Sequence, residues 1–201
     1  MIAREAVEKD SEALPLDTPD DWQLLREFVI ASAHELLVGT GVRVRQLDVP
    51  LAIDREHVDD FVSLVGFLSD NLNGSVVIRA SREFALLSHP MRGRMTLAEE
   101  DAIDWMGELG NQLLGRIKNR CVNRGLDFQI GYPHVVSGKA VGVKSSREAK
   151  SFVFQFECNG LDVAVFVDAI LRSGAALFSA ATHDAQREGQ VLFLEAQRQS
   201  K

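Results

Sequence analysis

The chain has 201 residues with a formal net charge of −7; 46% of its residues are hydrophobic and 25% are charged. This length suits one globular domain with a proper core, and the composition is that of an ordinary soluble fold rather than a fibrous or low-complexity one. The acidic charge argues against a nucleic-acid partner, because binding to a phosphate backbone relies on clustered lysine and arginine.

The first predicted element is a helix that follows a loosely attached acidic tail. Residues 1–17 mix charges with little periodicity and end in a proline-containing turn. Thr18 fits the N-cap position and Pro19 fits the first helical position. Apolar residues then recur with a period near 3.6 until Gly39 and Gly41, which we expect to end the helix.

Strand patterns follow this helix. Residues 42–49 alternate between apolar and polar side chains, and residues 57–70 form a second β-rich run. The sequence NLNG at 71–74 predicts a turn, which leads into a strand at 75–80. Residues 81–87 fit a short helix.

The second half repeats the order of helix and strands. A long helix over residues 97–120 is predicted to begin with a capping box made by Thr96 and Glu99. Two β-rich segments at 126–133 and 134–138 come next.

A basic stretch of small residues at 142–150 is predicted as a loop. Two β-rich runs then flank Asn159 and Gly160, and this dipeptide is the strongest hairpin signal in the chain. The order of elements, with hairpins rather than regular crossovers, predicts an α+β domain with a mainly antiparallel sheet packed against two long helices.

We expect this domain to span residues 18–172. The extension at 173–201 is left open between a helix, a further strand at 191–195 and a partly ordered tail.

Neither a membrane span nor a metal site is indicated. The longest apolar runs fall well short of a membrane span, and residues 1–20 lack a hydrophobic signal core. The two cysteines are far apart in sequence, and the five histidines show no ligand spacing. We therefore expect a cytoplasmic protein with no metal or cofactor of its own and no membrane partner.

The long helix carries a polar surface opposite its apolar face. At about 100° per residue, Asp104, Glu108, Asn111 and Gly115 fall within a narrow arc. An exposed Glu and Asn need no function by themselves. Gly115, however, costs about 1 kcal/mol relative to alanine, and a bare backbone on an exposed face suits close approach by another surface.

These residues resemble a signature of the CheC, CheX and FliY group of chemotaxis phosphatases, and the chain is most similar to CheX. The signature is an acid or serine, then Glu, Asn and Pro, which correspond here to Asp104, Glu108, Asn111 and Pro133. The gap between Asn and Pro is one residue shorter than usual. The likeness extends over residues 18–170 in the order of elements and implies a CheX/CheC-like fold.

The resemblance implies a phosphatase that acts on the aspartyl phosphate of a CheY-like response regulator. Asn111 would orient the attacking water, and Glu108 would pair with a lysine of the regulator. Asp104, Gly115 and Pro133 would serve docking, with Pro133 shaping the loop after the helix. His134 is a weaker candidate for the same surface. The only Mg²⁺ expected is the one bound in the partner receiver.

The resemblance also bears on assembly and on the number of sites. A homodimer is implied by analogy with CheX. One site per chain is expected, because Glu35 of the first helix could match a second glutamate but Val38 stands where the second Asn would be. The alternatives are a non-catalytic receiver-binding module and a motor-switch-associated component, and the intact pair of Glu108 and Asn111 favours the enzyme.

Overall fold

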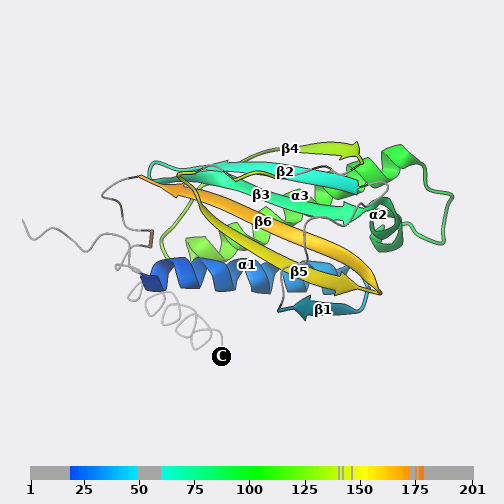
Figure 1. Cartoon of the computed structure of the whole chain (residues 1–201), viewed down its shortest axis with the longest axis horizontal. Coiled ribbons are helices and arrows are strands. Elements are labelled where there is room, and N and C mark those ends of the chain that lie inside the picture. The colour runs from blue at the N-terminus through cyan, green and yellow to red at the C-terminus, as the bar shows by residue number, and fades with distance from the viewer. Residues whose placement is uncertain are drawn as a thin grey trace, which may run out of the picture.

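The computed structural model describes residues 19–48, 60–139, 141, 143–145, 147–172, 175 and 177–178. The predicted tail at 1–17 and nearly all of the extension at 173–201 lie outside these residues, so the domain boundaries stay predictions. The described elements are, in chain order, α1 (Pro19–Gly39), β1 (Val44–Leu47), β2 (Asp60–Leu68), β3 (Leu72–Ser81), α2 (Arg82–Ser88), α3 (Glu99–Val122), β4 (Gln129–Gly138), β5 (Lys150–Cys158) and β6 (Leu161–Leu171) (Figure 1).

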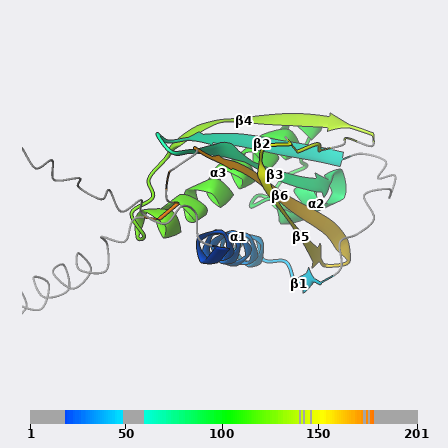
Figure 2. The ribbon, with the colours of Figure 1, turned by 60° about the vertical axis from the view of Figure 1, so that its left-hand side comes forward.

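The strands form one antiparallel sheet with the order β1-β5-β6-β3-β2-β4. The helices lie on one side of this sheet, with α3 directly beside it and α1 next to α3 (Figure 2). This arrangement confirms the predicted α+β fold with an antiparallel sheet and two long helices.

The hairpin at Asn159 and Gly160 is confirmed. Both residues have positive φ, at 52° and 85°, as a tight turn between two twisted strands requires. The Asn159 side chain also holds the start of β1, because its Oδ1 accepts a hydrogen bond of 2.8 Å from the N–H of Arg43.

The predicted turn at 71–74 is wrong by two residues, because Asn73 and Gly74 lie inside β3. Ser69 closes the actual turn: its N–H donates to the carbonyl of Leu72, and its hydroxyl accepts from the N–H of Leu72 at 2.9 Å. Gly74 has a packing role instead, since a Cβ there would lie 2.6 Å from the ring of Phe67.

The start of α3 also differs from the prediction. The helix begins at Glu99 with Ala98 at the N-cap, so the predicted capping box of Thr96 and Glu99 is wrong. Asp101 instead provides a capping hydrogen bond, since its Oδ2 accepts from the N–H of Ala98 at 2.7 Å. An acid in the first turn also suits the positive end of the helix dipole.

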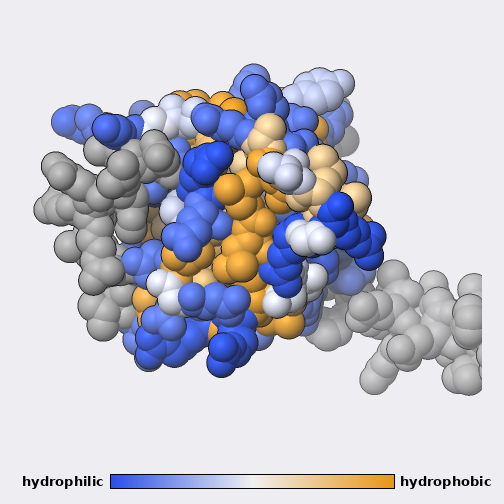
Figure 3. All heavy atoms as spheres, turned by 90° about the vertical axis from the view of Figure 1, so that its right-hand side faces the viewer, coloured by the Kyte–Doolittle hydropathy of each residue, from blue (hydrophilic) through white to orange (hydrophobic). Residues whose placement is uncertain are grey.

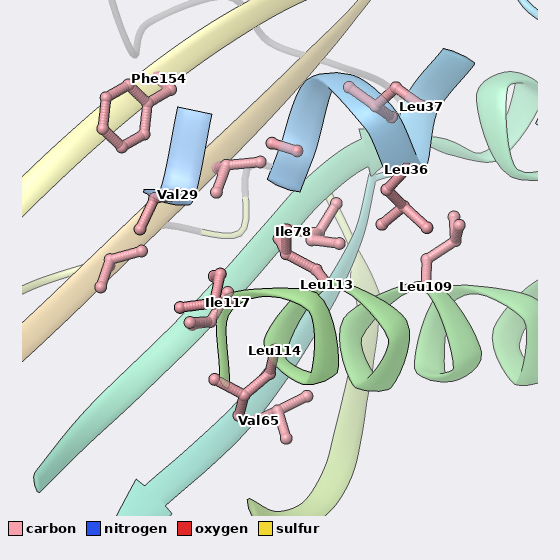
Figure 4. Close-up of a cluster of buried hydrophobic side chains, with 14 of the residues drawn as sticks. Val29, Leu36, Leu37, Val65, Ile78, Leu109, Leu113, Leu114, Ile117 and Phe154 are labelled. Atoms are coloured by element: carbon pink, nitrogen blue, oxygen red, sulfur yellow. The ribbon is translucent and has the colours of Figure 1, made fainter. Parts of the chain in front are cut away.

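The core lies between the sheet and the two long helices. In Figure 4, Leu114 of α3 lies beside Val65 of β2, and Leu36 of α1 lies opposite Leu109 of α3. All four of these side chains are buried. Helix α3 is therefore held from two directions, and only its remaining side is left to solvent.

The other face of the sheet is partly covered by the predicted loop after β4. Val141 and Val143 pack against a small buried cluster of Val62, Val77 and Phe166. The Ser145 hydroxyl donates a hydrogen bond of 2.8 Å to Asp168. At the end of the molecule that carries α2, hydrophobic side chains form a strip between hydrophilic ones (Figure 3).

The described residues offer neither a membrane-spanning helix nor a cluster of metal ligands. None of the helices described is both long and apolar enough to span a bilayer. Within the same part of the chain, no three His, Cys, Asp or Glu side chains gather as metal ligands would.

Candidate functional site

The solvent side of α3 carries the predicted residues. Asp104 and Glu108 are exposed, whereas Asn111 and Gly115 are half-buried along the same side of the helix. The Glu108 carboxylate is held in place, because its Oε1 accepts a hydrogen bond of 2.7 Å from the Nε2 of Gln112. The amide of Asn111 makes no hydrogen bond to any other side chain of the described residues, so it is free to bind a ligand.

The three glycines of α3 have different surroundings. A Cβ at Gly110 would collide with the Ser63 hydroxyl and would lie 2.9 Å from Cγ2 of Val65, so β2 requires glycine there. A Cβ at Gly107 would touch Val135 at 3.5 Å, which is ordinary contact. At Gly115 nothing of the chain lies within 4 Å, so its own fold does not require a glycine.

Pro133 lies beside the site, but not in the predicted way. It is part of the edge strand β4, paired with Val65 of β2, so the expectation that it shapes a loop after the helix is wrong. An edge strand tolerates proline because it need not donate to a neighbour on its outer side. The Pro133 ring lies 3.7 Å from where a Cβ of Gly107 would be, one helical turn before Asn111. The sheet therefore brings the four predicted signature residues to one region.

His134 does not join this region. Adjacent residues of a strand point to opposite faces, and Pro133 faces α3. His134 pairs with Leu64, whose exposed side chain belongs to the opposite face of the sheet. His134, the weaker candidate for the docking surface, therefore lies away from that surface.

The first helix offers no second copy of the site. Glu35 forms an ion pair with Arg120 of α3 and is thereby engaged in packing α1 against α3. Val38, which stands where the second Asn would be, is exposed and apolar. The described residues thus hold one copy of the predicted pair.

Two supporting contacts were not predicted from the sequence. Gln112 fixes Glu108, and the spacing of four residues on a helix is the signal that could have revealed it. The second contact joins α3 to α2: Trp105 Nε1 donates to the Ser88 hydroxyl at 2.9 Å, and the His89 ring meets the Trp105 ring edge to face at 5.6 Å. No local sequence pattern predicts this contact, because it depends on how α2 packs against α3.

Part of the chain is similar to a family of known proteins. Residues 61–157 match the family model described as chemotaxis phosphatase CheX. The comparison with curated proteins gives no match.

Three solved structures illustrate the likeness of fold. Chemotaxis protein CheX from Vibrio vulnificus has 19% identity and a TM-score of 0.63, over 76% of this chain and 99% of that one. A CheC-like superfamily protein from Shewanella sp. PV-4 has 19% identity and a TM-score of 0.59, over 73% and 97%. The CheX of a CheX–CheY–BeF₃–Mg²⁺ complex from Borrelia burgdorferi has 15% identity and a TM-score of 0.53, over 76% and 99%.

The predicted resemblance to the CheC, CheX and FliY group is thereby confirmed. Its fold is that of the CheX and CheC-like structures.

Proposed function

We propose that this CheX-like protein is a cytoplasmic phosphatase of the aspartyl phosphate on a CheY-like response regulator. The observation that carries the proposal is the unengaged amide of Asn111, which lies beside a restrained Glu108 on the solvent side of α3. The family model is that of a chemotaxis phosphatase. The similar CheX from Borrelia burgdorferi was crystallised with CheY, BeF₃ and Mg²⁺.

The chemistry asks little of the protein beyond position and charge. An acyl phosphate next to the receiver's own Mg²⁺ is already activated, so holding a water in line accounts for much of the rate. An amide is no useful general base, so Asn111 would act by geometry. It would donate to the phosphoryl group and accept from the water.

Glu108 would fix the register of docking. Its carboxylate would pair with a lysine near the receiver's phosphate in a charge-assisted hydrogen bond. Asp104 lies one turn earlier on the same side and adds negative charge for the same lysine. Gly115 would let the receiver's backbone approach α3 closely.

The test measures phosphate release from phosphorylated receivers of the same genome. We expect Asn111→Ala to lower the maximal rate by about a hundredfold or more, because the water is no longer aligned. Asn119→Ala is the matched control, since Asn119 is an exposed amide two turns further along α3. The control variant should keep the wild-type rate.

Phosphate release, receiver binding and co-purification together separate the alternatives. Equal rates for wild type and Asn111→Ala would remove Asn111 from catalysis. A receiver-binding module would bind without accelerating dephosphorylation in either form, and a motor-switch component would co-purify with a multi-subunit assembly.

The homodimer stays a prediction. Both edge strands, β1 and β4, pair on one side only within the described residues. Sedimentation equilibrium of the purified chain measures the mass directly.

A further inference from the structure

We infer that Arg116 is the second charged anchor of the docking surface on α3 and that it binds an acidic group of the receiver. This inference rests on the proposed function. It adds what the partner must present: a basic group for Glu108 and an acidic group for Arg116, at a fixed separation.

The first step is the order of charges along α3. Residues Asp104, Glu108, Gln112 and Arg116 follow one another at intervals of four and form a continuous row along the helix, in which only Gln112 is half-buried and the others are exposed. The row is negative at its start and positive at its end. Gln112 lies between the acidic residues and Arg116 and is hydrogen-bonded to Glu108.

The second step compares Arg116 with the other basic residues of this helix. Lys118 is engaged with Asp127 at 3.0 Å, and this hydrogen bond lowers the pKa of the Asp127 carboxyl. Arg120 is engaged with Glu35 of α1. Arg116 is exposed and has no ion pair or hydrogen bond to another described side chain. Of the three, only Arg116 is left for a partner.

The third step gives the geometry. Glu108 and Arg116 are eight residues apart, which is about 12 Å along the helix axis at about 1.5 Å per residue. Gly115, one turn beyond Asn111, leaves the helix backbone bare beside this row. A partner can therefore contact the backbone of α3 while its charges reach both anchors.

The character of this face points to a transient partner rather than a second copy of the chain. A mixed-charge row is also self-complementary, so two copies could pair through α3. Permanent homodimer interfaces are, however, apolar, and the exposed side of α3 from Asp104 to Asn119 is polar. Charge pairs at the rim of a transient interface steer encounter and fix orientation.

The experiment measures binding and turnover separately. The probes are receivers of the same genome, in the phosphorylated form for turnover and in the beryllofluoride-activated form for binding. We expect Arg116→Glu to raise both Kd and KM by about tenfold or more, with kcat within a factor of about two. Added salt should weaken wild-type binding more than binding of this variant.

Two controls make the result specific. Lys144→Glu changes the charge equally but lies in the loop that crosses the other face of the sheet, so its Kd should equal that of wild type. Arg116→Lys keeps the charge and should retain most of the affinity. Circular dichroism of each variant checks that the fold is intact.

The outcomes distinguish this inference from the proposed function. If a receiver binds through Arg116 but is not dephosphorylated, the docking role stands and the phosphatase fails. If turnover is normal and Arg116→Glu binds as wild type does, the docking role is overturned and the phosphatase stands. A wild-type dimer that Arg116→Glu dissociates, with KM unchanged or lowered, would assign the residue to a second copy and overturn the inference. The inference is also overturned if no receiver binds.

Discussion

The contrast between Gly110 and Gly115 gives a sharp test of how α3 sits on the sheet. Alanine at either position gains the same helix propensity, about 1 kcal/mol over glycine. The two positions differ in what the new methyl group meets. At Gly110 it would lie 2.9 Å from Val65 and closer still to the Ser63 hydroxyl, whereas at Gly115 it meets nothing within 4 Å.

The expected difference follows from this geometry. Overpacking a close-packed core costs about 1 to 3 kcal/mol, and the gain in propensity cancels when the two variants are compared. Gly110→Ala should therefore unfold with a free energy about 1 to 3 kcal/mol lower than that of Gly115→Ala. Gly115→Ala itself should be more stable than wild type by up to about 1 kcal/mol.

Urea unfolding followed by circular dichroism measures these differences, provided that the slope with denaturant stays constant among the variants. Ser63→Ala supplies a further control, because the Ser63 hydroxyl is buried without a hydrogen-bond partner among the described residues. Its removal should lessen the cost of Gly110→Ala. Equal stability of Gly110→Ala and Gly115→Ala would refute the close approach of α3 to β2.

Two further predictions concern buried ionisable groups. Arg79→Met should lower the free energy of unfolding by about 3 to 5 kcal/mol, because Nε and Nη2 of Arg79 both bind Oδ2 of Asp60, whose side chain is 1% exposed. Recovery of stability in the double variant Asp60→Asn, Arg79→Met, measured by urea unfolding, would confirm the cause, and a single variant as stable as wild type would contradict it. Burial raises the pKa of the Cys121 and Cys158 thiols to about 12, above the ordinary value near 8.5, so their contribution to stability should be complete below about pH 8.5 and decline as the pH rises towards 12. The native thiols should resist a disulfide reagent at pH 8, and the stability of the Cys→Ala double variant should depend less on pH. Rapid labelling of the native chain would contradict the burial.

The sequence predicted those parts of the fold that local rules determine. Asn159 and Gly160 define their hairpin because a two-residue turn needs positive φ at both positions. The pattern of α3 likewise separates an apolar side from a polar one. The predicted start of α3 failed because a helix can be capped in several registers, and Asp101 rather than Thr96 provides the hydrogen bond.

The contacts that could not be predicted are those between distant parts of the chain. Gly107 and Gly110 had no local explanation, since their reason is the proximity of β4 and β2. The resemblance implies a loop at Pro133, whereas this residue lies within β4. Only the order of strands shows that β4 is an edge, where proline is tolerated. The same register places His134 on the opposite face.

The positions of the site residues depend on these long-range contacts. Asn111 is on α3 and Pro133 is on β4, and the packing of α3 on β2 and β4 sets the spacing between them. A methyl group at Gly110 must move the helix or the strand by a fraction of an ångström. In the proposed mechanism, turnover depends on the placement of a water, whereas affinity depends on the outer charges of Glu108 and Arg116. Gly110→Ala should therefore lower kcat more than it raises KM. Gly115→Ala leaves the helix in place, so any effect should be on KM. If Gly110→Ala instead changed mainly KM and Gly115→Ala changed mainly kcat, the geometry of the site would not depend on how the helix packs.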